Sequence, residues 1–267
     1  MEGTTHHVRT RHTSQTRIAC VRSESDRAEA AYHELVRCYD LVRPEESDVI
    51  VALGGDGFML HALHAYLPLG RPMFGMNCGT VGFLMNAYRP EALLERIEAA
   101  EAFQLHPLIM QVITTAGRVE EALAFNEVTV IRHTGQSANI RVVVDRVERI
   151  AKFVGDGMIV ATAAGSTAYN LSAHGPIVPL GASVLALTPV SPFRPRRWRG
   201  ALLPHTTEVV FENLDPQKRP LTATADFKEI FDVVSVTVRE DRSTTVTLLF
   251  DPDHSLEERI AAEQFAF

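Results

Sequence analysis

The sequence predicts two domains, an α/β domain followed by a mostly antiparallel β domain. Between residues 17 and 103, short apolar runs alternate with segments that carry apolar residues at helical spacing, which is typical of βαβ units around a parallel sheet. Beyond about residue 104 the apolar period changes to two, and runs rich in Val, Ile and Thr are separated by turn residues. A chain of 267 residues has ample length to bury a core in both domains.

The first domain, residues 17–103, is expected to alternate strands and helices. Buried strands are predicted at 18–21, 48–53 and 72–76, and helices at 28–38, 58–67 and 90–102. Pro90 suits the first turn of the last helix, where the backbone N–H that it lacks has no helical partner in any case.

The second domain, residues 104–250, is expected to consist of short strands. They are predicted at 109–114, 125–132, 139–144, 158–162, 207–211, 233–239 and 244–250. Residues 1–16 lack periodicity, so we expect a disordered tail there. Residues 251–267 contain Ser255-Leu256-Glu257-Glu258, which resembles a helix-capping start, and are expected to form a closing helix against the α/β domain.

Composition and charge exclude several classes of protein. Apolar residues make up 46% and charged residues 22%, which is typical of a soluble globular protein. The formal net charge of -7 argues against non-specific binding to nucleic acid or anionic membranes as the main activity. The cysteines, Cys20, Cys38 and Cys78, are far apart, which favours reduced thiols. Because no long apolar run and no apolar signal core is present, we expect a cytoplasmic protein without nucleic-acid or membrane partners.

A glycine turn follows the predicted strand 48–53. It consists of Gly54-Gly55-Asp56-Gly57, so Asp56 lies at the carboxyl end of a strand, where open α/β sheets bind ligands and helix amino ends meet phosphates. The pattern is neither the phosphate-binding P-loop nor the dinucleotide glycine fingerprint. Two interpretations stay open: Asp56 takes a proton or holds a cation, or it only caps the helix that follows.

A second glycine-containing loop follows the predicted strand 72–76. Gly79 and Gly82 lie three residues apart in it, together with Asn77 and Thr80. Glycines allow another group to approach the backbone, so the loop suits a turn near a ligand. A plain strand-to-loop crossing is the equally weighted alternative.

Asn126 and Glu127 stand together at the head of the predicted strand 125–132. An amide offers a donor and an acceptor suited to an adenine edge, and a carboxylate accepts from ribose hydroxyls. Neighbouring strand residues point to opposite faces, so both serve one pocket only where the backbone is bent. A solvated strand end is the alternative.

The run from Thr162 to Pro176 combines small residues, hydroxyl groups and one aromatic ring, as a close-fitting polar pocket requires. Tyr169 is suited to stacking on a base, and Thr167, Asn170 and Ser172 are suited to hydrogen bonding. Another acidic glycine turn, Gly155-Asp156-Gly157, precedes this run.

Together these segments resemble the NAD kinase family. The resemblance rests on Gly54–Gly57, Asn126–Glu127, Gly155–Gly157 and Gly165–Ser172, in that order, and covers roughly residues 17–250. It implies an amino-terminal Rossmann-like α/β domain, a carboxyl-terminal β-sandwich-like domain, a site between them and a homodimer or homotetramer. It also implies ATP-dependent phosphorylation of the adenosine ribose 2′-hydroxyl of NAD, giving NADP, with Mg²⁺ accompanying ATP.

The resemblance also implies roles for individual residues. Asp56 becomes the proposed general base with Gly57 beside it, Asn126 and Glu127 hold the adenosine, and Asp156 helps on the nicotinamide side. The members of the small-residue run that would contact the dinucleotide are Thr167, Ala168, Tyr169, Asn170, Leu171 and Ser172. Because an alcohol is a poor acid before the transition state, Asp56 stays open to two other roles, positioning the hydroxyl or binding the metal.

Two rival functions share parts of the pattern. The glycine turn also occurs in diacylglycerol-type lipid kinases and 6-phosphofructokinases, but a lipid kinase would lack the run from Thr167 to Ser172. A non-catalytic NAD(P)-binding sensor would keep the pocket, while Asp56 became dispensable.

Weaker candidates for contact with ATP or phosphate are spread along the chain. They are Gly54, Gly55, His64, Arg197 and Arg199. The two arginines belong to a basic cluster at 191–199, for which a subunit interface, a solvated loop and a nucleic-acid patch are the alternatives. The resemblance also implies a further ligand contact at Asp226.

No metal site is expected among the protein side chains. His61 and His64 lie three residues apart on the predicted helix 58–67, but no third ligand is evident. His6 and His7 lie in the expected tail and are interpreted as solvated.

Overall fold

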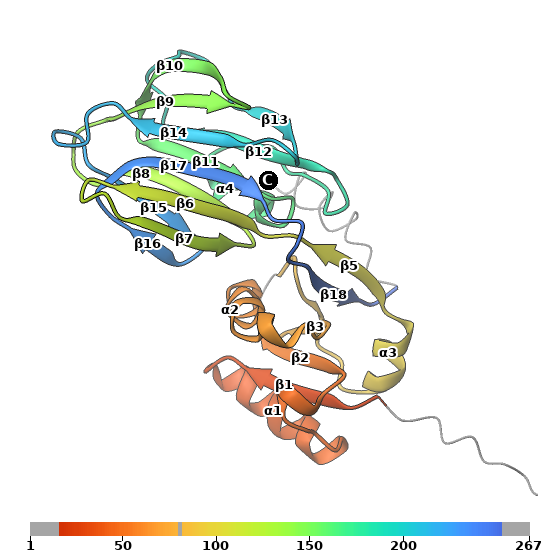
Figure 1. Ribbon diagram of the computed structural model, residues 1–267. Coiled ribbons are helices and arrows are strands. Elements are labelled where there is room, and N and C mark those ends of the chain that lie inside the picture. Colours follow the sequence, from red (N-terminus) through yellow and green to blue (C-terminus); the bar gives the residue numbers. More distant parts are fainter. Residues whose placement is uncertain (1–15, 80–81, 253–267) are drawn as a thin grey trace, which may run out of the picture.

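The computed structural model describes residues 16–79 and 82–252 and shows two lobes (Figure 1). The lower lobe in this view combines helices with a sheet, and the upper lobe is built mainly from strands. The predicted fold class, an α/β domain followed by a β-sandwich-like domain, is therefore confirmed. Most of the predicted tail and closing helix, including His6, His7 and the capping start, lies outside the described residues.

The α/β lobe is built on a 6-stranded sheet with the order β1-β2-β3-β18-β5, in which β4 also pairs with β3. The strands are β1 (Ile18–Arg22), β2 (Val49–Gly54), β3 (Met73–Asn77), β4 (Asn86–Ala87), β5 (Glu101–Leu105) and β18 (Val246–Phe250). The pairs β1–β2 and β2–β3 are parallel, as predicted. Every residue of β2 is buried, because a central parallel strand is covered on both faces.

Helices cover both faces of this sheet. Helices α1 (Asp26–Cys38) and α3 (Leu93–Ala99) pack on one face, and α2 (Asp56–Tyr66) packs on the other. The Ser25 side chain caps α1 by accepting from the backbone N–H of Ala28. Two short 3₁₀ turns, η1 (Pro44–Glu46) and η2 (Leu67–Leu69), complete the lobe.

The third helix is shorter than the predicted 90–102. Ala92 has a left-handed φ of 50°, which stops the helix from extending back to Pro90. At the other end, the chain enters β5, where Phe103 packs edge-on against Phe250 of β18 at 5.5 Å between ring centroids. Strand pairing with β18 therefore replaces the last predicted helical turn.

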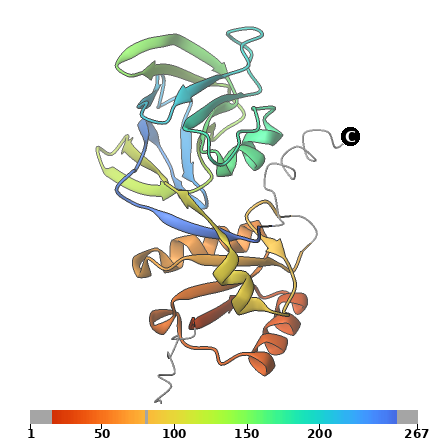
Figure 2. The same cartoon turned by 90° about the vertical axis from the view of Figure 1, so that its right-hand side faces the viewer.

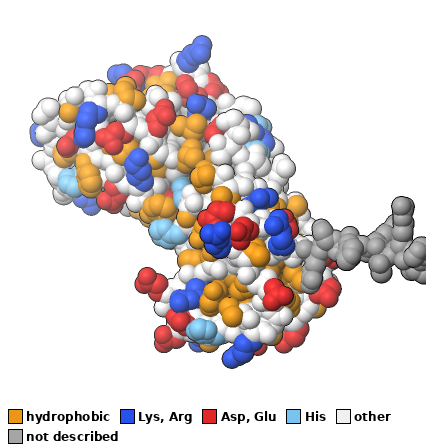
Figure 3. Space-filling view, turned by 60° about the horizontal axis from the view of Figure 1, so that its bottom comes forward, with side chains coloured by type: hydrophobic (Ala, Val, Ile, Leu, Met, Phe, Trp, Pro, Cys, Tyr) orange, Lys and Arg blue, Asp and Glu red, His pale blue; other side chains and the backbone are white. Residues whose placement is uncertain are grey.

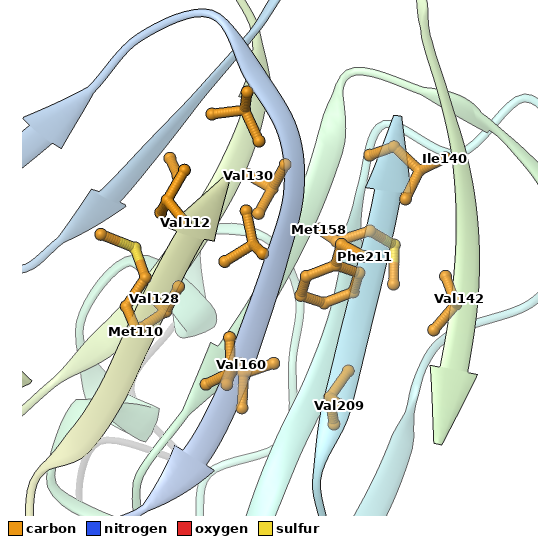
Figure 4. Close-up of a cluster of buried hydrophobic side chains, with 14 of the residues drawn as sticks. Met110, Val112, Val128, Val130, Ile140, Val142, Met158, Val160, Val209 and Phe211 are labelled. Atoms are coloured by element: carbon orange, nitrogen blue, oxygen red, sulfur yellow. The ribbon is translucent and has the colours of Figure 1, made fainter. Parts of the chain in front are cut away.

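The β lobe is a sandwich of two 6-stranded antiparallel sheets, with the orders β10-β9-β14-β17-β6-β7 and β13-β12-β11-β8-β15-β16. Its core lies between them, and Figure 4 shows Met110, Val112, Val128, Met158 and Phe211 among the facing side chains. Full burial of such a side chain contributes roughly 1.5–3 kcal/mol. The strands are β6 (Leu108–Thr114), β7 (Val119–Ala124), β8 (Glu127–Arg132), β9 (Ala138–Val144), β10 (Val147–Gly155), β11 (Gly157–Ala161), β12 (Val184–Val190), β13 (Ala201–Pro204), β14 (Val209–Asn213), β15 (Leu221–Ala225), β16 (Lys228–Ile230) and β17 (Val233–Glu240).

The last predicted strand exists but belongs to the other lobe. The sequence pattern assigns 244–250 to the β domain, whereas β18 pairs with β3 and β5 in the α/β sheet. The chain thus returns from the sandwich to the first lobe, as Figures 1 and 2 show. Within residues 82–252, the chain passes between the lobes twice, from β5 to β6 and from β17 to β18.

The remaining helical elements follow β11. They are η3 (Ala164–Thr167) and α4 (Tyr169–Ser172). No helix within residues 16–79 and 82–252 is both long and apolar enough to cross a membrane. On the face drawn in Figure 3, basic and acidic side chains are interspersed over both lobes.

Candidate active site

The glycine turn joins β2 to α2. Strand β2 ends at Gly54, Gly55 occupies the N-cap position, and Asp56 is the first residue of α2, so Asp56 is not the cap. Its Oδ2 accepts a hydrogen bond from the backbone N–H of Phe83 at 2.6 Å, and its Oδ1 accepts from that of Leu84 at 2.9 Å. These two bonds fix the direction of the carboxylate toward the loop that follows β3.

Gly82 lies against the Asp56 carboxylate. A Cβ at this position would lie 2.8 Å from Oδ1 of Asp56 and 3.1 Å from Cγ of Met85. Only a glycine therefore lets this loop close on the acidic side chain. The close approach favours the interpretation of the loop as part of a site over that of a plain crossing.

Asn126 and Glu127 lie where the chain enters β8, which begins at Glu127. Oδ1 of Asn126 and Oε2 of Glu127 are buried, and neither has a hydrogen-bond partner within the part of the chain that the structure describes. Buried polar atoms in folded proteins are nearly always hydrogen-bonded. Two neighbouring exceptions indicate a place where a ligand supplies the donors.

The surroundings of Glu127 raise its pKa to about 8. Burial is the main cause, because it disfavours the charged carboxylate, and the nearby charge of Asp226 adds to it. A hydrogen bond from the backbone N–H of Tyr169 opposes the shift. A carboxyl group that is perturbed in this way, next to unpartnered polar atoms, is typical of a functional site.

The small-residue loop after β11 packs against Asn126. A Cβ at Gly165 would lie 2.1 Å from the backbone oxygen of Asn126, so this crossing requires glycine. Oγ1 of Thr162 donates to the backbone oxygen of Phe125 at 2.7 Å and anchors the loop. Tyr169, the first residue of α4, is 41% exposed, which leaves its ring available for stacking.

Asn170 has a role that differs from the predicted ligand contact. Its side chain is fully buried, and Nδ2 donates to the backbone oxygens of Ser166 and Pro176 at 3.0 and 2.9 Å. Its Oδ1 accepts from Oγ1 of Thr188 at 2.6 Å. The Asn170 amide thus holds the shape of the loop, because its two donors and its acceptor bind three groups from different parts of the chain. Around it, Thr167, Ala168 and Leu171 are half-buried and Ser172 is exposed.

Asp226 contacts protein groups, whereas the resemblance implied a ligand contact. Its side chain is fully buried, and the carboxylate accepts from the backbone N–H groups of Phe125 at 2.7 Å and Asn126 at 3.0 Å. Nε2 of His64, on α2, is hydrogen-bonded to the same carboxylate at 2.7 Å. One ring nitrogen of His64 therefore has a protein partner, and the phosphate contact of this residue stays a prediction.

Packing brings the main segments together at the junction of the lobes. One hydrophobic cluster contains Met59 of α2, Leu84 and Met85 of the loop that holds Asp56, Phe125 beside Asn126, and Ala164 beside Gly165. The glycine turn, the Asn126–Glu127 pair and the small-residue loop therefore share one wall. This is the location between the domains that the resemblance implied.

Asp156 lies away from Glu127, beside the other end of β8. Its backbone oxygen accepts from the N–H of Arg132, at the far end of β8 from Glu127. At about 3.3 Å per strand residue, this separation is roughly 17 Å. The Asp156 carboxylate instead accepts a hydrogen bond from Nε of Arg132.

The basic cluster at 191–199 adjoins Asp156. Val154 and Arg194 form an isolated antiparallel bridge, which fixes the start of the cluster beside the turn that holds Asp156. Arg197 and Arg199 are exposed. Within one chain, the predicted phosphate contacts from these arginines therefore lie on the Asp156 side and apart from Asp56.

The described residues do not assemble a metal site. No group of three or more His, Cys, Asp or Glu side chains that could hold a metal is present within 16–79 and 82–252. The ring of His61 stacks on Phe227 at 4.3 Å, while His64 is hydrogen-bonded to Asp226. Both histidines thus connect α2 to the turn after β15, His61 by ring stacking and His64 by a hydrogen bond.

Thr188, which supports the site, escaped sequence-based prediction. Its Oγ1 donates to Oδ1 of Asn170 across 18 residues of sequence, and no local pattern distinguishes it from other strand threonines. Thr162 belongs to the predicted small-residue run, but its bond to Phe125, across 37 residues, was not predicted. The sequence indicated the close contact of Gly82 with Asp56 only weakly, through the spacing of the two glycines in the loop.

Known proteins match this chain over both lobes. The family model described as ATP-NAD kinase N-terminal domain matches residues 4–103, and the ATP-NAD kinase C-terminal domain matches residues 125–209. An NAD kinase from Xylella fastidiosa (strain 9a5c) is 55% identical over 95% of this chain and 98% of the relative. One from Caulobacter vibrioides is 52% identical over 94% of this chain and 96% of the relative.

Solved structures show the same fold. A yeast NADH kinase complexed with NADH matches with a TM-score of 0.78 at 17% identity, covering 96% of this chain and 89% of that chain. An NAD kinase from Archaeoglobus fulgidus in complex with ATP matches with a TM-score of 0.72 at 25% identity, covering 92% and 99%. Matches to both family domains and to a relative that is 55% identical over 95% of this chain show that the chain belongs to the NAD kinase family.

Proposed function

We propose that this chain transfers the γ-phosphate of ATP to the adenosine ribose 2′-hydroxyl of NAD and so makes NADP, with Asp56 accepting the hydroxyl proton. The observation that carries the proposal is the pair of buried, unpartnered oxygens on Asn126 and Glu127. They require hydrogen-bond donors, and the adenine amino group and ribose hydroxyls are donors of the required kind.

The other residues complete the dinucleotide site. Tyr169 stacks on the adenine, and the half-buried or exposed members of its run line the ribose and phosphates; these are Thr167, Ala168, Leu171 and Ser172. Gly57 leaves room beside the turn, since a Cβ there would meet nothing within 4 Å. Gly54 and Gly55 lie at the amino end of α2, where the helix favours the phosphates of ATP.

Phosphoryl transfer requires alignment more than covalent chemistry from the protein. The two backbone N–H groups that bind Asp56 hold its carboxylate in one direction. A carboxylate so held takes the proton from the 2′-hydroxyl as the new bond to phosphorus forms, or keeps the hydroxyl in line for attack. Both roles depend on the same fixed position.

Mg²⁺ enters with ATP as part of the donor substrate, where it offsets the charge of the phosphates. Both oxygens of Asp56 already accept backbone N–H groups. Within 16–79 and 82–252, the chain offers no cluster of three metal-ligating side chains. We propose that the ATP phosphates would supply most of the ligands of the ion.

The direct test is NADP formation by the purified chain from NAD, ATP and Mg²⁺. We expect NADP as the product. A protein that binds NAD but forms no NADP would instead be a sensor, and one that phosphorylates diacylglycerol in place of NAD would be a lipid kinase. Either of these results would overturn the proposal.

Gly82→Ala is expected to lower kcat by at least about tenfold, because the added methyl group displaces the Asp56 carboxylate and small misplacements of a reacting group are costly. Steady-state kinetics measure the effect. Gly135→Ala is the matched control, since a Cβ at Gly135 meets nothing within 4 Å. An unchanged kcat in Gly82→Ala would mean that the position of Asp56 does not limit the reaction.

We further propose a homodimer or homotetramer in which Asp156 serves the nicotinamide side of a partner subunit's site. The separation of Asp156 from Glu127 along β8 motivates this arrangement, because one chain does not bring the two together. Arg197 and Arg199 lie on the same side as Asp156 and would reach the same partner site. The negative net charge of -7 and these exposed arginines suit contact between copies better than contact with nucleic acid.

Mixed assemblies test this arrangement. Asp56→Asn and Asp156→Ala are each expected to be nearly inactive, whereas their co-expressed mixture should recover about a quarter of wild-type activity if the assembly pairs subunits by two-fold symmetry. One of the two sites in each mixed dimer is then intact. A mixture as inactive as its components, or a monomeric mass in solution, would rule out shared sites.

We place the reaction in the cytoplasm. The three cysteines, Cys20, Cys38 and Cys78, are free thiols in the structure, which suits a reducing compartment. Burial also raises the pKa of the Cys20 thiol to about 12, so this thiol stays protonated and unreactive.

A further inference from the structure

The junction between the lobes contains a buried carboxylate with four donors. Asp226 lies in the turn between β15 and β16 with a left-handed φ of 52°. Its Oδ1 accepts from the N–H groups of Asn126 at 3.0 Å and Glu127 at 3.3 Å, and its Oδ2 accepts from the N–H of Phe125 and from Nε2 of His64, both at 2.7 Å. A fully buried charge persists only with such a set of partners.

His64 belongs to the helix that begins at Asp56. At 1.5 Å per residue, these two residues are about 12 Å apart along α2. The His64 ring packs edge-on between Phe125, at 4.9 Å, and Phe227, at 4.8 Å. This aromatic packing holds the ring in the orientation that reaches Asp226.

The four donors come from two different lobes. Three are backbone N–H groups of the segment that leads into β8, and only His64 comes from the α/β lobe. The Asp226 carboxylate therefore ties the helix that carries Asp56 to the segment that carries Asn126 and Glu127. Loss of the His64 donor removes this tie and leaves the three backbone bonds in place.

We propose that His64 and Asp226 are positioning residues for the phosphoryl transfer. By fixing the Asn126–Glu127 segment against α2, the pair sets the distance between the bound adenosine ribose and the Asp56 carboxylate. The inference rests on the dinucleotide-binding role proposed above for Asn126 and Glu127. Neither His64 nor Asp226 needs to touch the substrate, because one acts through the helix and the other through backbone N–H groups.

The test compares three single variants at saturating ATP. His64→Leu removes the donor and is expected to lower kcat about tenfold while KM for NAD changes less than about threefold, since alignment is lost and the binding groups remain. His64→Gln places an amide nitrogen near the position of Nε2 and should keep kcat within about threefold of wild type. His61→Leu, one turn earlier on α2, removes only ring stacking on Phe227 and is the matched control.

The outcomes separate a positioning role from general packing. An equal fall in kcat for His64→Leu, His64→Gln and His61→Leu would assign His64 to packing and overturn the proposal. A wild-type kcat in His64→Leu would also overturn it. Thermal melting of each variant shows whether the fold is intact; should His64→Leu not fold, Asp226→Asn takes its place and should lose kcat where His64→Gln does not.

Two further variants distinguish failure of this inference from failure of the proposed site. Asn126→Ala and Glu127→Gln, assayed alongside, should both raise KM for NAD. If neither does, the dinucleotide site itself is wrong, and the positioning role falls with it. If both do while His64→Leu behaves as wild type, the site stands and only the positioning role is overturned.

Discussion

Replacing Asp56 by Asn is expected to lower kcat for NADP formation by about 10²–10⁴-fold, the range that general acid–base catalysis supplies. KM for NAD should stay within about threefold, because the amide keeps the shape of the carboxylate and the binding groups are untouched. The amide has one accepting oxygen, whereas Phe83 and Leu84 each present an N–H to the carboxylate. Steady-state kinetics and a melting curve should therefore be measured together.

Asp26→Asn is the control for this substitution. Asp26 occupies the matching place in the first turn of α1, and its side chain is exposed. We expect wild-type kinetics from it. A loss of less than about tenfold in Asp56→Asn would assign Asp56 to holding the hydroxyl, since proton transfer by a positioned group contributes more than that. No loss at all would remove Asp56 from the chemistry.

The local elements of the fold could be predicted because periodicity reports burial within one segment. Strand β2 is apolar at every position and is buried throughout, so both its existence and its parallel setting follow from the sequence. Strand β18 shows the limit of this reasoning. Its alternating pattern identifies a strand, but its partners β3 and β5 lie far away in the sequence, and the pattern does not name them.

Other strands were missed because their residues carry contrary local signals. Strand β12 (Val184–Val190) contains Pro189, which argues against a strand inside a sheet, yet it pairs on both sides. Strand β10 (Val147–Gly155) carries several exposed polar residues and has irregular register against β9, as an edge strand does. In both cases tertiary pairing outweighs local preference.

The residues of the candidate site also differ in whether local sequence patterns could reveal them. The places of Asp56 after β2 and of the Asn126–Glu127 pair at the start of β8 could be predicted, because glycine turns and strand ends are local signals. The roles of Asn170 and Asp226 could not, because a buried amide or carboxylate has the same appearance in sequence as one that faces a ligand. Asp226 meets its partners across 99 to 101 residues of backbone and, at His64, across 162.

Above the Glu127 pKa of about 8, replacing Glu127 by Gln is expected to raise KM for NAD by about 10- to 100-fold, because each hydrogen bond to a charged group contributes about 1.5–3 kcal/mol. Gln keeps the size of the side chain but replaces one accepting oxygen with a donor, which faces the ribose hydroxyl donors. The measurement is KM for NAD with kcat as the internal reference. Glu101→Gln, at the exposed start of β5, is the control.

The same residue should give NAD binding a characteristic pH dependence. In the free protein, burial and the charge of Asp226 raise the Glu127 pKa from 4.5 to about 8, so the folded state holds a proton that the unfolded chain releases. The protonated Glu127 side chain contributes fully to stability below pH 4.5, and this contribution is lost as pH rises through 8. Glu127→Gln should therefore melt at a higher temperature than wild type above pH 8.

NAD binding should depend on the same proton. Hydroxyl donors from NAD favour the ionised carboxylate, and binding therefore expels the proton. KM for NAD in the wild type should fall as pH rises from 6 to about 8 and then level off, whereas Glu127→Gln should show no such fall. A wild-type KM that is flat across this window would mean that Glu127 does not receive the ribose hydroxyls.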